Sequence, residues 1–242
     1  MTAGLLDLPA PLFGAVEEAL AGHVPPLWRL GLWAALAALV SIELYRMLSP
    51  QRRIAAAAAD LRRAQGALAA FDGEFRDALP LMRRTMAAAG RRLAMVFPAS
   101  IAAALPILAL LVWLDGAYGA RLPDPGQPVA VKAEPAGLEA RWVDAAGGRD
   151  GAVVVTDGPR EVARAAVQAP VTSIHKWRWW NLLVGNPAGY LPPAAPVERV
   201  DIDLPRNELV GVGPPWMRGW EVPFLLLFTV FALVARRARR VV

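Results

Sequence analysis

The sequence of 242 residues is 56% hydrophobic, has a formal net charge of +5 and contains no cysteine. Without cysteine, neither disulfides nor thiolate metal sites are available. The apolar residues are clustered in runs of about 20, the length that a helix needs to cross a bilayer. We therefore expect a membrane protein, and we attribute the basic charge to membrane topology and not to binding of a specific nucleic acid.

Residues 1–26 are predicted to form an amphipathic segment on the outer face of the membrane. Apolar residues recur at helical spacing, Glu17 and Glu18 are polar, and Pro25-Pro26 ends the pattern. An interfacial helix is one interpretation, and a disordered leader is the alternative. Because no Lys or Arg precedes Arg29, the positive start of a cleavable signal peptide is missing.

Three membrane-spanning helices are predicted, at residues 27–48, 93–114 and 216–235. The first carries the polar residues Arg29, Ser41, Glu43 and Arg46. Polar side chains at membrane depth usually face protein or a water-filled cavity. Alternatively, Arg29 extends to the outer surface, while Glu43 pairs with Arg46 or with an arginine of the segment that follows.

Residues 49–92 are charged and rich in alanine, and they are predicted to form two helices that fold back on each other at Asp72-Gly73. Apolar residues at three-four spacing give each helix one narrow seam, as in a coiled coil. The predicted seams are Ile54, Ala57, Leu61, Ala64, Leu68 and Phe71 in the first arm, and Phe75, Leu79, Met82, Met86, Ala89 and Leu93 in the second. We therefore expect an antiparallel coiled-coil hairpin.

Arginine is concentrated in this hairpin and again in residues 236–242, which include Arg236, Arg237, Arg239 and Arg240. Basic segments tend to remain on the cytoplasmic side of a membrane. The expected topology therefore has the N-terminus outside, the hairpin and a basic C-terminal tail in the cytoplasm, and three spans in a bacterial inner (plasma) membrane.

Residues 115–215 contain short β-prone runs separated by glycine and proline, which predicts a small periplasmic β domain, expected to be a sandwich. The predicted strands are residues 129–131, 138–143, 152–156, 162–167 and 197–204, with turn signals at Gly147-Gly148, Asp157-Gly158 and Pro192-Pro193. The domain has no recognisable nucleophile with a base, no metal-ligand spacing and no phosphate loop. We therefore expect neither an enzyme nor a bound cofactor or metal.

Within this domain, Trp177, Trp179 and Trp180 lie next to Lys176 and Arg178. This composition is typical of a membrane interface and also of a protein-binding hot spot. Burial of the tryptophans in the core of the domain, with the cations covering them, is the third interpretation.

The order of these segments resembles that of the YidC/Oxa-type membrane insertases: an outside N-terminus, a span, a basic cytoplasmic hairpin and a second span. The resemblance is carried by residues 44–51 leaving the first span, by Met82, Met86, Arg91 and Arg92 running into Phe97-Pro98, and by residues 216–220 before the last span. The chain looks most like the reduced three-span members, such as the archaeal YidC-like proteins and the insertase subunit of the endoplasmic-reticulum membrane complex. It departs from them in carrying its β domain between the second and third spans.

The resemblance implies an insertase or membrane-protein chaperone, whose partners are the lipid bilayer, client membrane proteins, and other membrane subunits or a second copy. It also implies a polar groove open to the cytoplasm, for which the candidates are Ser41, Glu43, Arg46, Ser100 and Thr229. The hairpin arginines that would contact the incoming chain are Arg52, Arg53, Arg62, Arg63, Arg83 and Arg84. For these arginines, binding of anionic lipid or ribosomal RNA, or simple solvation of the hairpin, is the alternative.

A different interpretation is a structural or assembly subunit of a larger inner-membrane complex. In that case the β domain would bind a partner outside the membrane through Trp177, Trp179 and Trp180. The two interpretations assign the function to opposite sides of the membrane.

Overall fold

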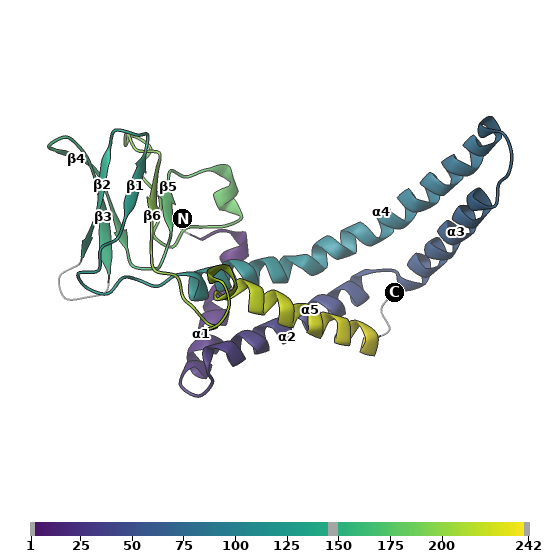
Figure 1. The fold of residues 1–242 in the computed structure, drawn as a ribbon, viewed down its shortest axis with the longest axis horizontal. Coiled ribbons are helices and arrows are strands. Elements are labelled where there is room, and N and C mark those ends of the chain that lie inside the picture. Colours follow the sequence, from purple (N-terminus) through teal and green to yellow (C-terminus); the bar gives the residue numbers. More distant parts are fainter. Residues whose placement is uncertain (1–2, 145–149, 240–242) are drawn as a thin grey trace. The chain divides into compact units, whose positions relative to one another are not determined.

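The computed structural model describes residues 3–144 and 150–239, so the predicted turn at Gly147-Gly148 and Arg240 of the basic tail lie outside the described residues. The chain divides into two compact units, whose elements are labelled in Figure 1. We call residues 32–107 and 226–242 the helical unit, and residues 1–31 and 108–225 the β unit.

Most of the ordered structure is helical. The α-helices are α1 (Ala10–Ala21), α2 (Pro26–Leu48), α3 (Gln51–Ala69), α4 (Phe75–Leu114) and α5 (Glu221–Arg239). Short helical turns are η1 (Leu5–Asp7), η2 (Asp115–Gly119), η3 (Trp179–Leu182) and η4 (Pro215–Met217). Because α1 occupies the N-terminal segment, the alternative of a disordered leader is wrong.

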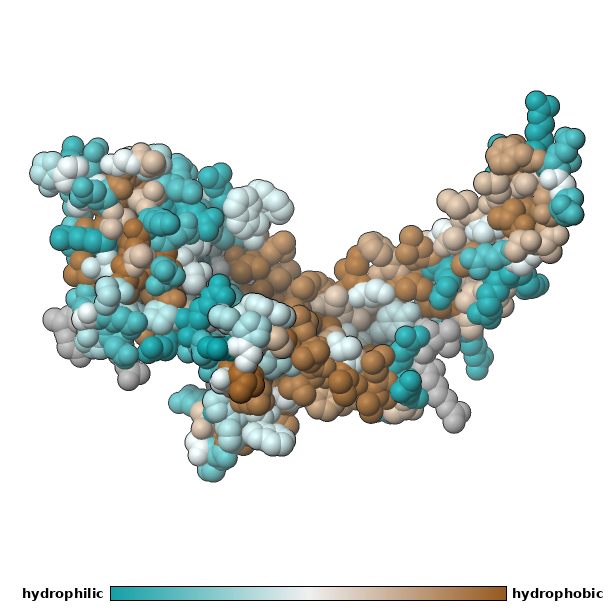
Figure 2. All heavy atoms as spheres, in the orientation of Figure 1, coloured by the Kyte–Doolittle hydropathy of each residue, from teal (hydrophilic) through white to brown (hydrophobic). Residues whose placement is uncertain are grey.

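Two helices in the described part of the chain are long and apolar enough to cross a membrane, namely α2 and the helix that runs from Phe75 to Gly119. The shorter α5 begins at Glu221 and ends with Arg236, Arg237 and Arg239, so its uncharged part runs only from residue 222 to residue 235. Figure 2 shows apolar residues gathered along α5. The two long apolar helices are typical of a membrane protein, and the third span stays a prediction.

Most of the buried residues of the helical unit have small side chains. Ala34, Ala37 and Ala38 of α2 are buried, and so are Ala99 and Ala103 of α4. In lipid there is no hydrophobic driving force between helices, so helix pairs are stabilised by close packing of their backbones. Small residues allow this close approach.

The predicted hairpin is present as α3 and the first half of α4. Of the predicted seam of the first arm, Ile54, Ala57 and Ala64 are buried in α3, and Leu61, Leu68 and Phe71 are half-buried. The seam of the second arm is wrong: Phe75, Met86 and Leu93, for example, are 71%, 74% and 63% exposed.

The half-buried side chains of the second arm are those of a different face, which includes Ala78, Leu81, Thr85 and Ala88. This arm has two faces with three-four apolar spacing, and the face with smaller side chains is the one turned inward. The Thr85 hydroxyl on this face donates to the carbonyl of Leu81, at 2.9 Å, so it is satisfied within its own helix.

The β unit contains two antiparallel sheets, each of three strands. Their strands are β1 (Val131–Glu134), β2 (Glu139–Asp144), β3 (Gly151–Asp157), β4 (Arg160–Val167), β5 (Ser173–His175) and β6 (Arg199–Ile202). The strand orders are β1-β6-β5 and β2-β3-β4. All five predicted strands occur with shifted ends, whereas β5 was not predicted.

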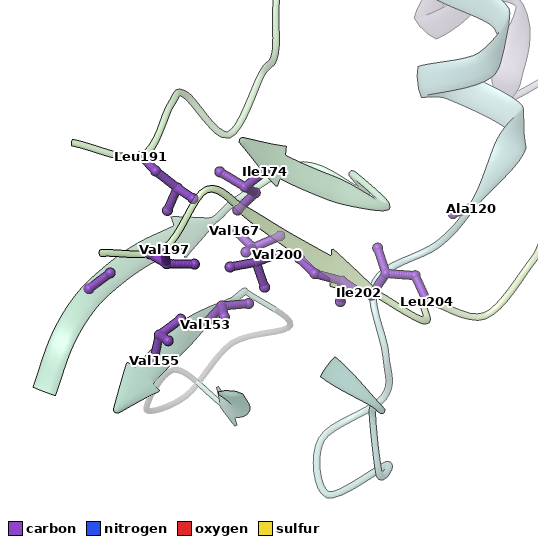
Figure 3. Packing of buried hydrophobic residues seen from close by; sticks show 11 residues of the cluster. Ala120, Val153, Val155, Val167, Ile174, Leu191, Val197, Val200, Ile202 and Leu204 are labelled. Carbon is purple, nitrogen blue, oxygen red and sulfur yellow. The ribbon is translucent and has the colours of Figure 1, made fainter. Parts of the chain in front are cut away.

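One hydrophobic core joins the two sheets, as a sandwich requires. Val153 and Val155 of β3 belong to the same buried cluster as Ile174 of β5 and Val200 of β6. Figure 3 shows these side chains gathered between the strands. At the edge of this core, the indole of Trp142 lies where a side chain on Gly151 would be, although Gly151 itself pairs with Asp144, so a larger residue at 151 would displace the indole.

Ile174→Ala tests the shared core. Ile174 is fully buried, so the substitution should lower the free energy of unfolding by about 2–5 kcal/mol through lost apolar burial and the cavity left behind. Urea unfolding of the solubilised protein, followed by tryptophan fluorescence, measures this. Val212→Ala is the control, because Val212 is 75% exposed and should change stability by less than about 0.5 kcal/mol. Equal losses in both variants would contradict the assigned core.

Candidate functional site: a polar cavity among the helices

A cavity of about 600 Å³ lies in the helical unit, lined by residues of α2, α3, α4 and α5. Three of the predicted groove residues line it together, although they come from three different helices: Ser41 from α2, Ser100 from α4 and Thr229 from α5. The lining also includes the polar side chains of Tyr45, Arg92 and Arg236. The cavity therefore combines hydroxyl and guanidinium groups with walls that are otherwise mainly apolar.

Tyr45, Arg92 and Arg236 are not among the predicted groove residues. The signal was present, because steps of three or four residues lead from Ser41 to Tyr45, from Arg92 through Val96 to Ser100, and from Thr229 to Arg236. Such steps keep residues on one side of a helix. The three missed residues lie toward the ends of the predicted spans. Polar side chains are common there, so their presence does not by itself indicate a groove.

Ser41 joins α2 to α4 at the cavity wall. Its hydroxyl donates to the backbone carbonyl of Ala103 at 2.9 Å. Pro106 lies in the same stretch of α4, and a proline within a helix removes the N–H that the carbonyl four residues earlier would accept. Ser41 therefore donates to a carbonyl in the part of α4 where Pro106 interrupts the regular backbone hydrogen bonds of the helix.

Glu43 and Arg46, the other predicted groove residues, are not among the residues that line the cavity. The Glu43 carboxylate pairs with Arg46 at 2.8 Å, as one interpretation predicted, and also with Arg239 of α5 at 2.7 Å. Through Arg239, Glu43 connects α2 to the end of α5 within the helical unit. The second partner was missed because nothing local in the sequence connects residues so far apart.

The six predicted contact arginines of the hairpin are all exposed, on α3 and α4: Arg52, Arg53, Arg62, Arg63, Arg83 and Arg84. Of these, Arg63 pairs with Asp60 of its own helix at 2.5 Å. Exposure alone is compatible with contact to an incoming chain, with lipid or nucleic-acid binding, and with simple solvation.

A continuous apolar stripe on α4 was missed as a surface, since its first residues had been assigned to the hairpin seam. We call it the α4 stripe, and it consists of Phe75, Leu79, Met82, Met86, Leu93, Phe97, Ile101 and Leu105, all at least 39% exposed. Its members follow one side of the helix and extend from the charged arm into the predicted span. On the charged arm, outside the predicted span, exposed apolar side chains such as those of Phe75, Met82 and Met86 are typical of an interaction site.

In the β unit, the tryptophan cluster is at the surface. Trp177, Trp179 and Trp180 are 51%, 68% and 45% exposed, so the interpretation that they form the core is wrong. The neighbouring cations Lys176 and Arg178 both pair with Glu198, at 2.6 and 3.4 Å. The hydrogen bond from Lys176 lowers the pKa of the Glu198 carboxyl. The cluster is therefore available to a protein or to a membrane surface.

Arg29 is turned toward protein and is not extended to the surface. It pairs with Glu17 of α1 at 2.8 Å, and their side chains are only 12% and 16% exposed. The hydroxyl of Tyr118 donates to the same carboxylate. This network holds α1, the start of α2 and η2 together within the β unit.

The cavity can solvate polar groups through its hydroxyls and its two arginines. The described lining residues include no carboxylate that could pair with these cations.

Comparison with known proteins gave no match: no family model, no curated protein and no solved structure matches this chain.

Single cysteines can test whether water fills the cavity, because the chain has no native cysteine. In native membranes, Ser41→Cys, Ser100→Cys and Thr229→Cys should react with a charged maleimide, since only a hydrated thiol forms the reactive thiolate. Leu36→Cys and Leu226→Cys are the controls, because these leucines face outward from α2 and α5, and lipid should protect them. Equal labelling of both sets would contradict a hydrated cavity.

Proposed function

We propose that this protein is a membrane-protein insertase or chaperone of the bacterial inner membrane. In this proposal three spans leave the hairpin and the C-terminal tail in the cytoplasm and the β domain outside. The observation that carries it is the gathering of Ser41, Ser100 and Thr229 from three helices into one cavity. Polar side chains at membrane depth are energetically unfavourable, and they usually face a water-filled cavity or a polar partner.

A transmembrane segment gains free energy by entering lipid, but its polar flank must cross first, at several kcal/mol for each charged or unpaired group. Hydroxyls and water in the cavity would solvate that flank partway across. Arg92 and Arg236 make the cavity electropositive, with no carboxylate among its described lining residues. We therefore expect acidic or neutral flanks to be preferred over basic ones.

The α4 stripe supplies a surface for the apolar part of a client. Met82 and Met86 are 40% and 74% exposed on the charged arm, and methionine adapts its shape to many apolar partners. Arg83 and Arg84 lie beside them in sequence and are exposed, so they can contact charged residues that flank the client's apolar segment. In this proposal the stripe leads a client from the hairpin toward the membrane.

A second candidate function is favoured by the exposed tryptophans of the β unit. Exposed Trp residues next to Arg commonly anchor protein partners, and Trp179 is 68% exposed here. The chain would then be a structural or assembly subunit of a larger membrane complex, bound to its partner through Trp177, Trp179 and Trp180.

Site-specific photocrosslinking in native membranes separates the two functions. With the probe at Ser100 or Met86, an insertase should give many short-lived adducts to newly made membrane proteins. The same probe at Leu105, which lies on the α4 stripe within the predicted span, should give mainly lipid adducts. A single stable protein adduct from Trp179, with none from Ser100 or Met86, would establish the assembly subunit and overturn the insertase.

Filling the cavity should also slow insertion. Ser100→Leu combined with Thr229→Leu replaces both hydroxyls with apolar side chains, and should lower the insertion rate of a client with a polar flank by about tenfold or more, since about 1.4 kcal/mol of barrier corresponds to tenfold. Trp177→Ala combined with Trp179→Ala is the matched control and should leave the rate unchanged. The assembly function predicts the reverse pattern.

A further inference from the structure

A second cavity, of about 860 Å³, lies entirely within the β unit and is separate from the sites described above. Its lining includes the end of α4, the start of α5 and the segment 169–173 before and within β5. The lining includes the apolar residues Leu111, Val112 and Trp113 and also several charged residues. It therefore has both the apolar and the ionic walls that an amphiphilic ligand needs.

The charged lining residues carry both signs. Asp115 and Glu221 lie close enough to interact electrostatically, and neither forms an ion pair or side-chain hydrogen bond with any residue that the structure describes. Arg206 lines the same cavity and likewise has no ion-pair partner in the described part of the chain. Asp7 differs, because its carboxylate already accepts hydrogen bonds from the backbone of Gly4 and Gly185, each at 2.7 Å.

A buried donor without an acceptor adds independent support. The Trp220 side chain lines this cavity and is 6% exposed, and its Nε1 has no hydrogen-bond acceptor within the residues described. This nitrogen is 3.8 Å from the position that a Cβ on Gly119, another lining residue, would occupy. A buried N–H without an acceptor costs stability, and a ligand oxygen would satisfy it.

We propose that this cavity binds the zwitterionic headgroup of phosphatidylethanolamine. The ammonium group lies between Asp115 and Glu221, and the phosphate faces Arg206. The Trp220 N–H donates to a phosphate or ester oxygen, and the acyl chains follow the apolar end of α4. Complementary charges of both signs select a zwitterion over a purely anionic lipid.

Other ligands fit these walls less well. The described residues contain no group of three or more potential ligands that could hold a metal ion. A basic peptide would bring its own cations toward Arg206 and would leave the apolar wall uncovered. The inference depends on the ends of α4 and α5 lying at a bilayer surface, but it does not depend on insertase activity.

Native mass spectrometry of the full-length protein in detergent, with equimolar dioleoyl lipids, tests the proposal. Phosphatidylethanolamine should be retained about tenfold more than phosphatidylcholine, whose quaternary ammonium cannot donate hydrogen bonds to the carboxylates. It should also exceed phosphatidylglycerol, which has no cation. Equal retention of the three lipids overturns the proposal. Because this comparison uses the unmodified protein, its result does not depend on the folding of any variant.

Isosteric variants then locate the site. Asp115→Asn combined with Glu221→Gln should reduce the preference for phosphatidylethanolamine about tenfold, to near equality with phosphatidylcholine. Glu139→Gln combined with Asp157→Asn is the matched control, because it makes the same change of charge at exposed residues of the sheet that do not line the cavity. A preference that survives in the first double variant, or selective retention of an oligolysine peptide in place of the lipid, overturns the proposal.

Discussion

The length of α4 constrains the rest of the chain. At about 1.5 Å per residue its 40 residues extend for about 60 Å, roughly twice the hydrocarbon thickness of a bilayer. If the apolar half crosses the membrane, the half that carries Arg83 and Arg84 has to project from it. Arg92 and Ser100 lie where the two halves meet, and both line the cavity of the helical unit. The cavity therefore forms at the level where a membrane gives way to water in this arrangement.

The polar groups of the apolar helices fall into two kinds. Arg29 with Glu17, and Glu43 with Arg46 and Arg239, are ion pairs that connect helices within one unit. The hydroxyls of Ser100 and Thr229 instead line a cavity together with cations. Paired charges serve the fold, because an unpaired charge at such a position is costly. The functional proposal is based on the polar groups that line the cavity.

Periodicity and composition predicted every long helix and five of the six strands. The groove of Ser41, Glu43, Arg46, Ser100 and Thr229 was implied by the resemblance in segment order, and three of these residues line one cavity. They failed where a choice depended on tertiary contacts. The second arm of the hairpin has two apolar faces, and only packing decides which one turns inward. Strand β5 has three residues, too few for alternation to be detected. Arg239 as the partner of Glu43, and Asp7 as the acceptor for Gly185, join residues that no local pattern relates.

Reconstitution tests insertase activity of the protein in the absence of other membrane proteins. The purified protein would be incorporated into liposomes, and insertion of a synthetic single-span protein with a short acidic flank would be followed by protease protection. The account predicts insertion about tenfold or more faster than into protein-free liposomes, equivalent to a barrier lowered by about 1.4 kcal/mol or more. An insertion rate equal to that of protein-free liposomes, with the protein folded and correctly oriented, would contradict it.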